Sequence, residues 1–117
     1  MEETITSNAA YFVSYKLKKG ASVSEFLLAS ERLNNEYMSK QKGYISWRQL
    51  IEGDMWVDLL TFETMDDAER VSNPTETNEL AEIFYSFINL NSCKVHLFTI
   101  ERSYKKIKSK EMYSNEH

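Results

Sequence analysis

Four polar side chains interrupt otherwise apolar stretches of the chain and are its first candidates for chemistry: Ser14, Arg48, Asp58 and His96. A carboxylate inside an apolar strand costs free energy unless it is paired or solvated, so Asp58 requires a partner, an interface or a cavity. Two interpretations stay open. Asp58 acts as an acid or base in a ligand pocket, or it forms a structural ion pair with Arg48 or across a subunit interface.

The expected strand phases extend this group with two aromatic residues. Five side chains then share the sheet face that helices leave uncovered: Ser14, Trp56, Asp58, His96 and Phe98. We predict two catalytic residues and four ligand-binding residues, namely Asp58 and His96, and Ser14, Arg48, Trp56 and Phe98. The alternative for His96 is packing, because a lone histidine in a strand is more often a core or interface residue than a catalyst.

Motifs for cofactor, metal and nucleophile sites are missing from the sequence. The chain has three glycines, too few for a phosphate-cradling loop. Its single cysteine, Cys93, rules out a C-x-x-C pair, and its two histidines, His96 and His117, lack metal-ligand spacing. No G-x-S-x-G motif is present. We therefore expect neither a metal nor a bound cofactor.

The hydrophobic period predicts the elements that must position the candidate residues. Apolar residues recur with helical spacing over 23–38 and in a second region, split in two, before the last strand. They alternate in four stretches: 11–17, 44–51, 55–62 and 95–100. This β-α-β-β-α-β order predicts an α+β, ferredoxin-like fold with a four-stranded antiparallel sheet.

Local signals set the expected boundaries. Ser22 with Glu25 forms a capping box, and Thr64 with Asp67 resembles a second cap. Asn73 and Pro74 predict the start of the third helix, and the fourth strand is predicted from Lys94 to about Glu101. We place the domain at residues 10–102, between a flexible leader, 1–9, and a polar tail, 103–117.

All four predicted strands carry large apolar residues on both faces. Two or three helices can cover only one face of a four-stranded sheet, so the other face requires a second partner. A contiguous exposed apolar patch above about 600 Å² is unusual for a soluble monomer. We therefore predict a homodimer that buries this face in an isologous interface.

The hairpin between strands two and three has two candidate registers. A two-residue Gly53-Asp54 turn of type II′ is good turn chemistry and places Asp58 opposite Gln49. A three-residue loop places Asp58 opposite Arg48 instead. We favour the second register, because it keeps the arginine from beneath the helices, where its burial would be costly.

Composition narrows the partners. The net charge is −4, which argues against nucleic acid, because phosphate binding needs a basic face. No apolar run reaches the ~20 residues needed to span a bilayer. The polar N-terminus does not resemble a signal peptide, and the single cysteine allows no intrachain disulfide. We expect a cytoplasmic protein.

Two segments resemble one protein family. GYISWRQL, from Gly43, and WVDLLTFETMDDA, from Trp56, are similar to segments of the dimeric α+β barrel superfamily, which includes the antibiotic-biosynthesis monooxygenase-like proteins. The resemblance covers about residues 10–102. It implies a ferredoxin-like subunit whose sheet pairs with another to form a barrel. It also implies a pocket between sheet and helices that takes an aromatic, polycyclic or haem-like molecule.

The chain departs from the oxygenases of that superfamily at two points. Those enzymes use an asparagine on the first strand, and the haem-degrading ones use a helical histidine; the predicted first strand has no asparagine and the predicted helices have no histidine. Trp56 lies on the third strand, where the oxygenases carry a tryptophan. Two functions stay open: a cofactor-independent, monooxygenase-like enzyme acting on a small apolar or aromatic molecule, or a non-catalytic dimeric ligand-binding or interaction module.

Overall fold

A computed structural model describes residues 8–107 of the chain. Their elements, in chain order, are β1 (Asn8–Leu17), α1 (Val23–Glu36), η1 (Met38–Lys40), β2 (Tyr44–Glu52), β3 (Met55–Phe62), α2 (Met65–Ser72), α3 (Glu79–Tyr85) and β4 (Ile88–Ile100). Residues 8 and 9, which we placed in the leader, belong to β1. The rest of the predicted leader and residues 108–117 of the predicted tail lie outside the described residues.

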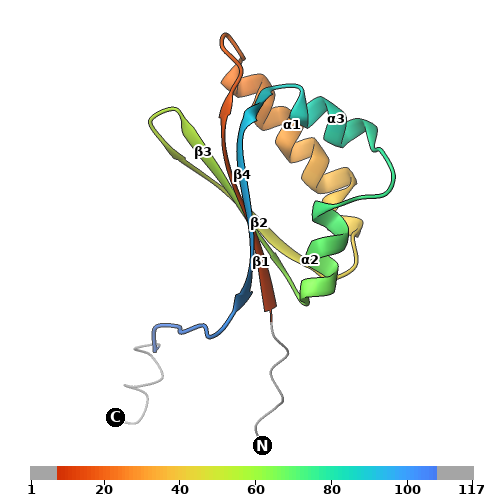
Figure 1. The fold of residues 1–117 in the computed structure, drawn as a ribbon, viewed down its shortest axis with the longest axis vertical. Coiled ribbons are helices and arrows are strands. Elements are labelled where there is room, and N and C mark those ends of the chain that lie inside the picture. Colours follow the sequence, from red (N-terminus) through yellow and green to blue (C-terminus); the bar gives the residue numbers. More distant parts are fainter. Residues whose placement is uncertain (1–7, 108–117) are drawn as a thin grey trace, which may run out of the picture.

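The four strands form one antiparallel sheet in the order β2-β3-β1-β4. Figure 1 shows α1, α2 and α3 on one side of this sheet, while no helix of the described chain lies on the other side. We call these the helix-covered face and the open face. The strand order and the layering confirm the predicted ferredoxin-like α+β fold.

The hairpin between β2 and β3 has the register that we did not favour. Its loop is the two-residue turn Gly53-Asp54, closed by the pair Glu52–Met55. Gly53 has a φ of +63° and Asp54 does not have a positive φ, which is the combination of a type II′ turn. Asp58 therefore pairs with Gln49, and Arg48 pairs with Leu59. Our burial argument failed because Arg48 and Leu59 lie on the open face, where the arginine stays exposed.

The strand phases also correct two predicted positions. Asp58 pairs with Val13 and Trp56 pairs with Tyr15, and all four side chains are buried on the helix-covered face. We had placed Asp58 and Trp56 on the open face. Strand β3 is apolar on both sides, so its alternation shows which residues share a face but not which face the helices cover.

The helix starts agree with the capping signals in two cases out of three. The side chain of Ser22 accepts a hydrogen bond from the N–H of Glu25, and Thr64 caps α2 in the same way. Helix α3 begins later than predicted, with Asn78 as its N-cap. Residues 73–78 consequently form a loop between α2 and α3.

Strand β4 begins at Ile88 and not at Lys94 as predicted. Ile88 and Asn89 pair with Leu17 and Lys16, and a register shift separates these pairs from the rest of the ladder. Ile88 is almost completely buried. Residues 88–93, which precede the predicted fourth strand, therefore extend the sheet.

The core lies between the helix-covered face and the helices, with Phe26 of α1 at its centre. The ring of Phe26 contacts four other aromatic rings at centroid distances of 5.2 to 6.2 Å: Tyr15, Trp56, Phe84 and Phe87. Edge-to-face and offset arrangements at these distances are favourable. This packing fixes α1 and α3 over β1 and β3, the strands that carry most of the candidate site.

Candidate active site

A cavity of about 300 Å³ lies between the helix-covered face and the helices. Its walls come from α1, η1, α2 and α3, and its lining is predominantly apolar and aromatic. The volume is at the small end of the ~300–1,000 Å³ that is usual for small-molecule sites. The residues of the sheet that form its floor are Tyr11, Val13, Tyr15, Trp47, Asp58 and Leu60.

Among residues 8–107, Asp58 is the only carboxylate on the floor of this cavity. Its residue is 3% exposed, and its Oδ1 accepts a hydrogen bond of 2.8 Å from the hydroxyl of Tyr15. Within residues 8–107, no basic side chain lies within ion-pair distance of it. Burial raises the pKa of Asp58 from 3.8 to about 6, because the hydrogen bond from Tyr15 and the nearby indole of Trp47 offset only part of the desolvation.

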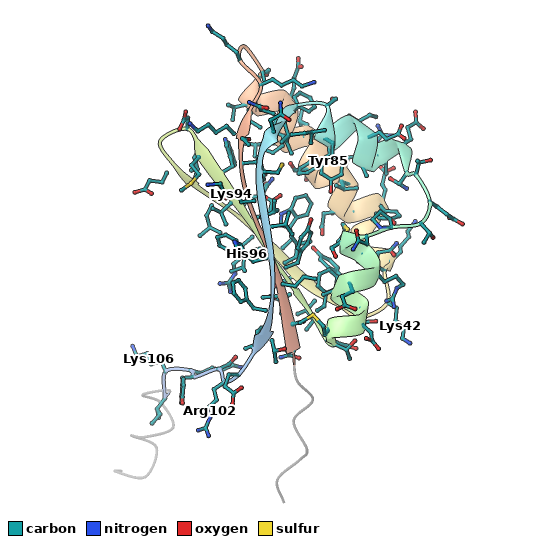
Figure 2. The ribbon with its side chains drawn as sticks, viewed as in Figure 1. Lys42, Tyr85, Lys94, His96, Arg102 and Lys106 are labelled. Carbon is teal, nitrogen blue, oxygen red and sulfur yellow. The ribbon has the colours of Figure 1, made fainter. Side chains whose placement is uncertain are left out.

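Three neutral tyrosines lie near this carboxyl group, and one of them, Tyr15, donates a hydrogen bond to it. Burial raises the pKa values of Tyr11, Tyr15 and Tyr85 above the usual range, and the negative charge of Asp58 raises them further. Figure 2 shows Tyr85 on the helix side of the sheet. These hydroxyls therefore stay protonated at neutral pH, so Tyr15 donates to Asp58 and does not compete with it as a base.

Trp47 contributes an unused donor to the same site. Its ring packs edge-on against Phe84 at a centroid distance of 5.5 Å. Its Nε1 is buried and has no hydrogen-bond partner among the described residues, although it is close enough to Asp58 to lower the pKa of that carboxyl. An unsatisfied buried donor costs roughly 1–3 kcal/mol, so such groups are uncommon.

Gln49, which pairs directly with Asp58 in the sheet, is engaged elsewhere. Its Nε2 donates a hydrogen bond of 2.9 Å to the hydroxyl of Ser30 in α1, and Ser30 in turn donates to the carbonyl of Phe26 at 2.8 Å. No hydrogen bond to Oδ2 of Asp58 comes from the described residues. Apart from the weak contact of the indole N–H with Asp58, this oxygen and the indole N–H therefore have no full hydrogen bond within the described residues, and both line the cavity.

The mouth of the cavity is polar and belongs to the loop between α2 and α3. Pro74, Thr75, Glu76 and Thr77 line it, together with Asn78, the cap of α3. All of these except Asn78 are exposed. The arrangement places exposed polar residues over an apolar interior with one buried acid, which is the usual composition of a small-molecule site.

The structure separates the predicted site residues into two groups. Asp58 alone reaches the cavity. Trp56 is buried beneath the helices, with its ring 5.2 Å from that of Phe26, and is not part of the cavity lining. The other four lie on the open face, where Phe12, His96 and Phe98 form an aromatic cluster with centroid distances of 5.7 to 6.4 Å.

Figure 2 shows Lys94 and His96 on the side of β4 that faces away from the helices. Ser14 pairs with Lys94 on this face, and Arg48 is exposed there. The predicted Arg48–Asp58 ion pair does not form, because the two side chains project from opposite faces of the sheet. A catalytic role for His96 and ligand binding by Ser14, Arg48, Trp56 and Phe98 stay predictions, without support from proximity to Asp58.

Sequence reasoning missed three contributors to the cavity. They are Tyr11, Tyr15 and Trp47, none of which was among the predicted site residues. The signal that could have identified them is the antiparallel pairing of β1 with β3, which sets Val13 against Asp58 and hence Tyr15 beside it.

The described part of the chain has neither a metal-ligand cluster nor a membrane-spanning helix. Residues 8–107 contain no group of three or more His, Cys, Asp or Glu side chains arranged to hold a metal ion. Over the same residues, none of the helices combines the length and apolar character needed to cross a membrane.

Comparison with known proteins gives a likeness of fold only. No family model matches the chain and no curated protein matches it. Among solved structures it is similar to SnoaB, a cofactor-independent oxygenase from Streptomyces nogalater, with 14% identity, a TM-score of 0.67 and coverage of 86% of this chain and 99% of that one.

Two further structures are similar over nearly their whole length. A putative antibiotic biosynthesis monooxygenase from Nitrosomonas europaea has 13% identity, a TM-score of 0.62 and coverage of 86% of this chain and 96% of its own. One from Bacillus cereus has 15% identity, a TM-score of 0.56 and coverage of 86% and 99%. The chain therefore has the subunit fold of antibiotic-biosynthesis-monooxygenase-like structures, as the sequence resemblance implied.

Proposed function

We propose that the cavity binds a small aromatic molecule and that Asp58 removes a proton from it, starting a cofactor-independent oxygenation. The observation that carries this proposal is the carboxyl group of Asp58, buried without a cation at the floor of an apolar cavity. Burial raises the pKa of Asp58 to about 6. The group is therefore mostly ionised at neutral pH, yet a stronger base than an ordinary aspartate, as general-base catalysis requires.

The chemistry needs dioxygen as oxidant and no other group. Asp58 accepts the proton of an acidic C–H or O–H bond, and the electron-rich anion that remains transfers one electron to O₂. Combination of the two radicals with a proton gives a hydroperoxide, which loses water to leave a ketone. The apolar walls favour this course, because they exclude water from the reactive anion.

The fold comparison supports this proposal as an analogy. SnoaB, which shares the fold, is described as a cofactor-independent oxygenase, but fold alone does not carry function. The alternative is a binding module without catalysis, which would use the same cavity. The enzyme and the binding module differ in one measurable property: only the enzyme consumes oxygen when an aromatic compound is bound.

Anthrone is a suitable probe, because its activated C–H group loses a proton readily and its oxygenation gives anthraquinone and water. We expect the wild-type protein to consume one O₂ for each anthraquinone formed, measured with an oxygen electrode and by absorbance. Asp58→Asn should slow this reaction about 100-fold or more. The rate should rise with pH through about 6, as the carboxylate forms.

Asp54→Asn is the matched control, because Asp54 is an exposed aspartate in the hairpin turn. Its rate should equal that of the wild type. Binding of anthrone without oxygen uptake would support the binding module, and equal rates for Asp58→Asn and the wild type would contradict Asp58 as the base.

The open face supports a second part of the proposal: the chain acts as a homodimer paired through this face. Phe98 and Leu50 are 51% and 46% exposed there, next to Phe12 and Leu59 on the central strands. An apolar patch of this kind fits an isologous interface with a second copy. Sedimentation should give twice the chain mass of 13.7 kDa, and Phe98→Glu should give the monomer.

A further inference from the structure

Trp47 and Asp58 form an incomplete hydrogen-bonding pair inside the cavity. They project from neighbouring strands onto the same face, because Trp47 pairs with Leu60 and Gln49 pairs with Asp58. The indole Nε1 is a buried donor without a partner among the described residues. It acts on Asp58 as a weak donor that lowers the pKa of that carboxyl, but the contact falls outside the limits of a full hydrogen bond.

Neighbouring side chains of the described residues form no full hydrogen bond with Nε1 of Trp47 or with Oδ2 of Asp58. Tyr15 occupies only Oδ1 of Asp58, and the amide of Gln49 donates to Ser30. The ring of Trp47 is held by its edge-on contact with Phe84, so the N–H direction is set by packing. Both Trp47 and Asp58 line the cavity. A ligand hydroxyl group can satisfy both, because its oxygen accepts a hydrogen bond and also donates one.

We propose that the site selects ligands with an aromatic hydroxyl group, whose oxygen accepts a hydrogen bond from Nε1 of Trp47 while its proton points to Oδ2 of Asp58. This inference rests on the proposed function, since it names the part of the aromatic ligand that the cavity recognises. When the hydroxyl proton moves to Asp58, the O–H bond breaks and its electron pair stays on the ligand oxygen. The indole N–H then stabilises that oxyanion, as donors do in oxyanion holes.

The arrangement predicts strong discrimination between ligands of similar shape. An apolar analogue would leave the donor of Trp47 and the acceptor of Asp58 unmatched in a water-poor site, and a methyl ether would satisfy only the donor. Sites built to bind a hydroxyl reject analogues that lack it far more strongly than apolar pockets reject a missing methylene. An aromatic alcohol should therefore bind much more tightly than either analogue.

Calorimetric titration with three naphthalene compounds tests this order. We expect 2-naphthol to bind the wild-type protein at least tenfold more tightly than 2-methoxynaphthalene or naphthalene. Trp47→Phe keeps an aromatic ring but lacks the N–H, so it should weaken 2-naphthol binding about tenfold and leave naphthalene binding unchanged. Tyr104→Phe, the matched control, removes the polar hydrogen of an exposed aromatic residue outside the cavity and should change neither affinity.

The possible results separate this inference from the function it rests on. Equal affinities for 2-naphthol and naphthalene, or an unchanged 2-naphthol affinity in Trp47→Phe, would overturn the hydroxyl selectivity and leave the aromatic site standing. Failure of all three compounds to bind would contradict the aromatic site itself, and the inference with it. The thermal melt of Trp47→Phe provides a check on folding: it should match or exceed the wild type, because the substitution removes an unsatisfied donor.

Discussion

Asp58 and Asp67 are equally buried, at 3% and 4% exposed, but their surroundings move their pKa values in opposite directions. Desolvation dominates at Asp58 and raises its pKa to about 6. At Asp67 the hydrogen bonds from Arg70 and Thr64 dominate and lower the pKa. Burial by itself therefore does not tell whether an acid is structural or reactive; the number and charge of its partners do.

Asp67 has every partner that a structural carboxylate needs. Arg70 donates to its Oδ1 at 2.7 Å and the hydroxyl of Thr64 donates to its Oδ2 at 2.8 Å. The backbone N–H of Asp67 donates to Thr64 in return, at 3.1 Å. Arg70 also donates to the carbonyl of Lys42 at 3.0 Å. The group joins the start of α2 to the segment before β2.

Asp58 accepts one full hydrogen bond within the described residues, from the neutral hydroxyl of Tyr15, and it lines the cavity. Its side chain projects from the central strand β3 toward the helices. A carboxylate with a full set of partners at this position would stabilise the fold but would not be a reactive base. The comparison predicts that substitutions around Asp67 will damage the fold, whereas removal of the charge of Asp58 will improve the fold and damage the activity.

The largest expected effect is that of Gly43→Ala. Gly43 has a φ of +81°, and a Cβ at this position would lie 2.0 Å from Oδ2 of Asp67. The left-handed backbone alone costs a non-glycine residue roughly 1–2 kcal/mol, and displacement of Asp67 from its partners adds to that. We expect a loss of more than about 2 kcal/mol in the free energy of unfolding, measured by urea denaturation.

Gly20→Ala is the control for this variant. Gly20 has nearly the same φ, +82°, but no atom lies within 4 Å of the position of its Cβ. It should show only the backbone cost. Equal losses in the two variants would mean that the contact between Gly43 and Asp67 is unimportant.

Asp58→Asn is expected to stabilise the protein at pH 7.5. It removes a buried charge but keeps the shape of the side chain and an acceptor for Tyr15. A pKa rise to about 6 corresponds to about 2–3 kcal/mol at pH values above both the folded and the unfolded pKa. Asp67→Asn should instead lower the free energy of unfolding, because it removes a charge that Arg70 and Thr64 stabilise. Destabilisation by both substitutions in urea denaturation would remove the distinction between the two acids.

The pH dependence of stability separates the same two groups. The pKa of Asp58 is raised in the folded state, so its favourable contribution is complete below about pH 4 and is lost as the pH rises to about 6. The pKa of Asp67 is lowered, so its contribution is present above about pH 4 and is lost below its folded pKa. In urea denaturation at pH 4, 5, 6 and 7.5, the free energy of unfolding of the wild type should decline as the pH rises. This decline should be absent from Asp58→Asn and retained in Asp67→Asn.

The smallest expected effect belongs to Arg32→Ala, which sharpens the contrast with Arg70→Ala. Arg32 pairs with Glu36 at 3.2 Å, and both side chains are more than half exposed. Such pairs contribute less than about 0.5 kcal/mol. Arg70→Ala should lower the melting temperature more, because it leaves Asp67 buried with one fewer partner. Equal melting temperatures would show that Arg70 contributes no more than a surface ion pair.

The sequence alone was sufficient for the order of elements and for the fold class. Period-2 and period-3.6 patterns are local, and the caps at Ser22 and Thr64 act within one helical turn. The sequence also singled out Asp58, because a carboxylate between Val57 and Leu59 is anomalous wherever the strand lies. The start of α3 was missed because Asn73 and Asn78 are competing caps of the same type.

Only the tertiary structure decided which face of the sheet the helices cover. Strands β1 and β3 are apolar on both sides, so their alternation is unchanged when the two faces are exchanged. That choice moved Asp58 and Trp56 beneath the helices, left His96 and Phe98 on the open face, and separated Arg48 from Asp58. It also brought Tyr15 and Trp47 beside Asp58, through pairings between residues more than ten positions apart, which no local pattern encodes.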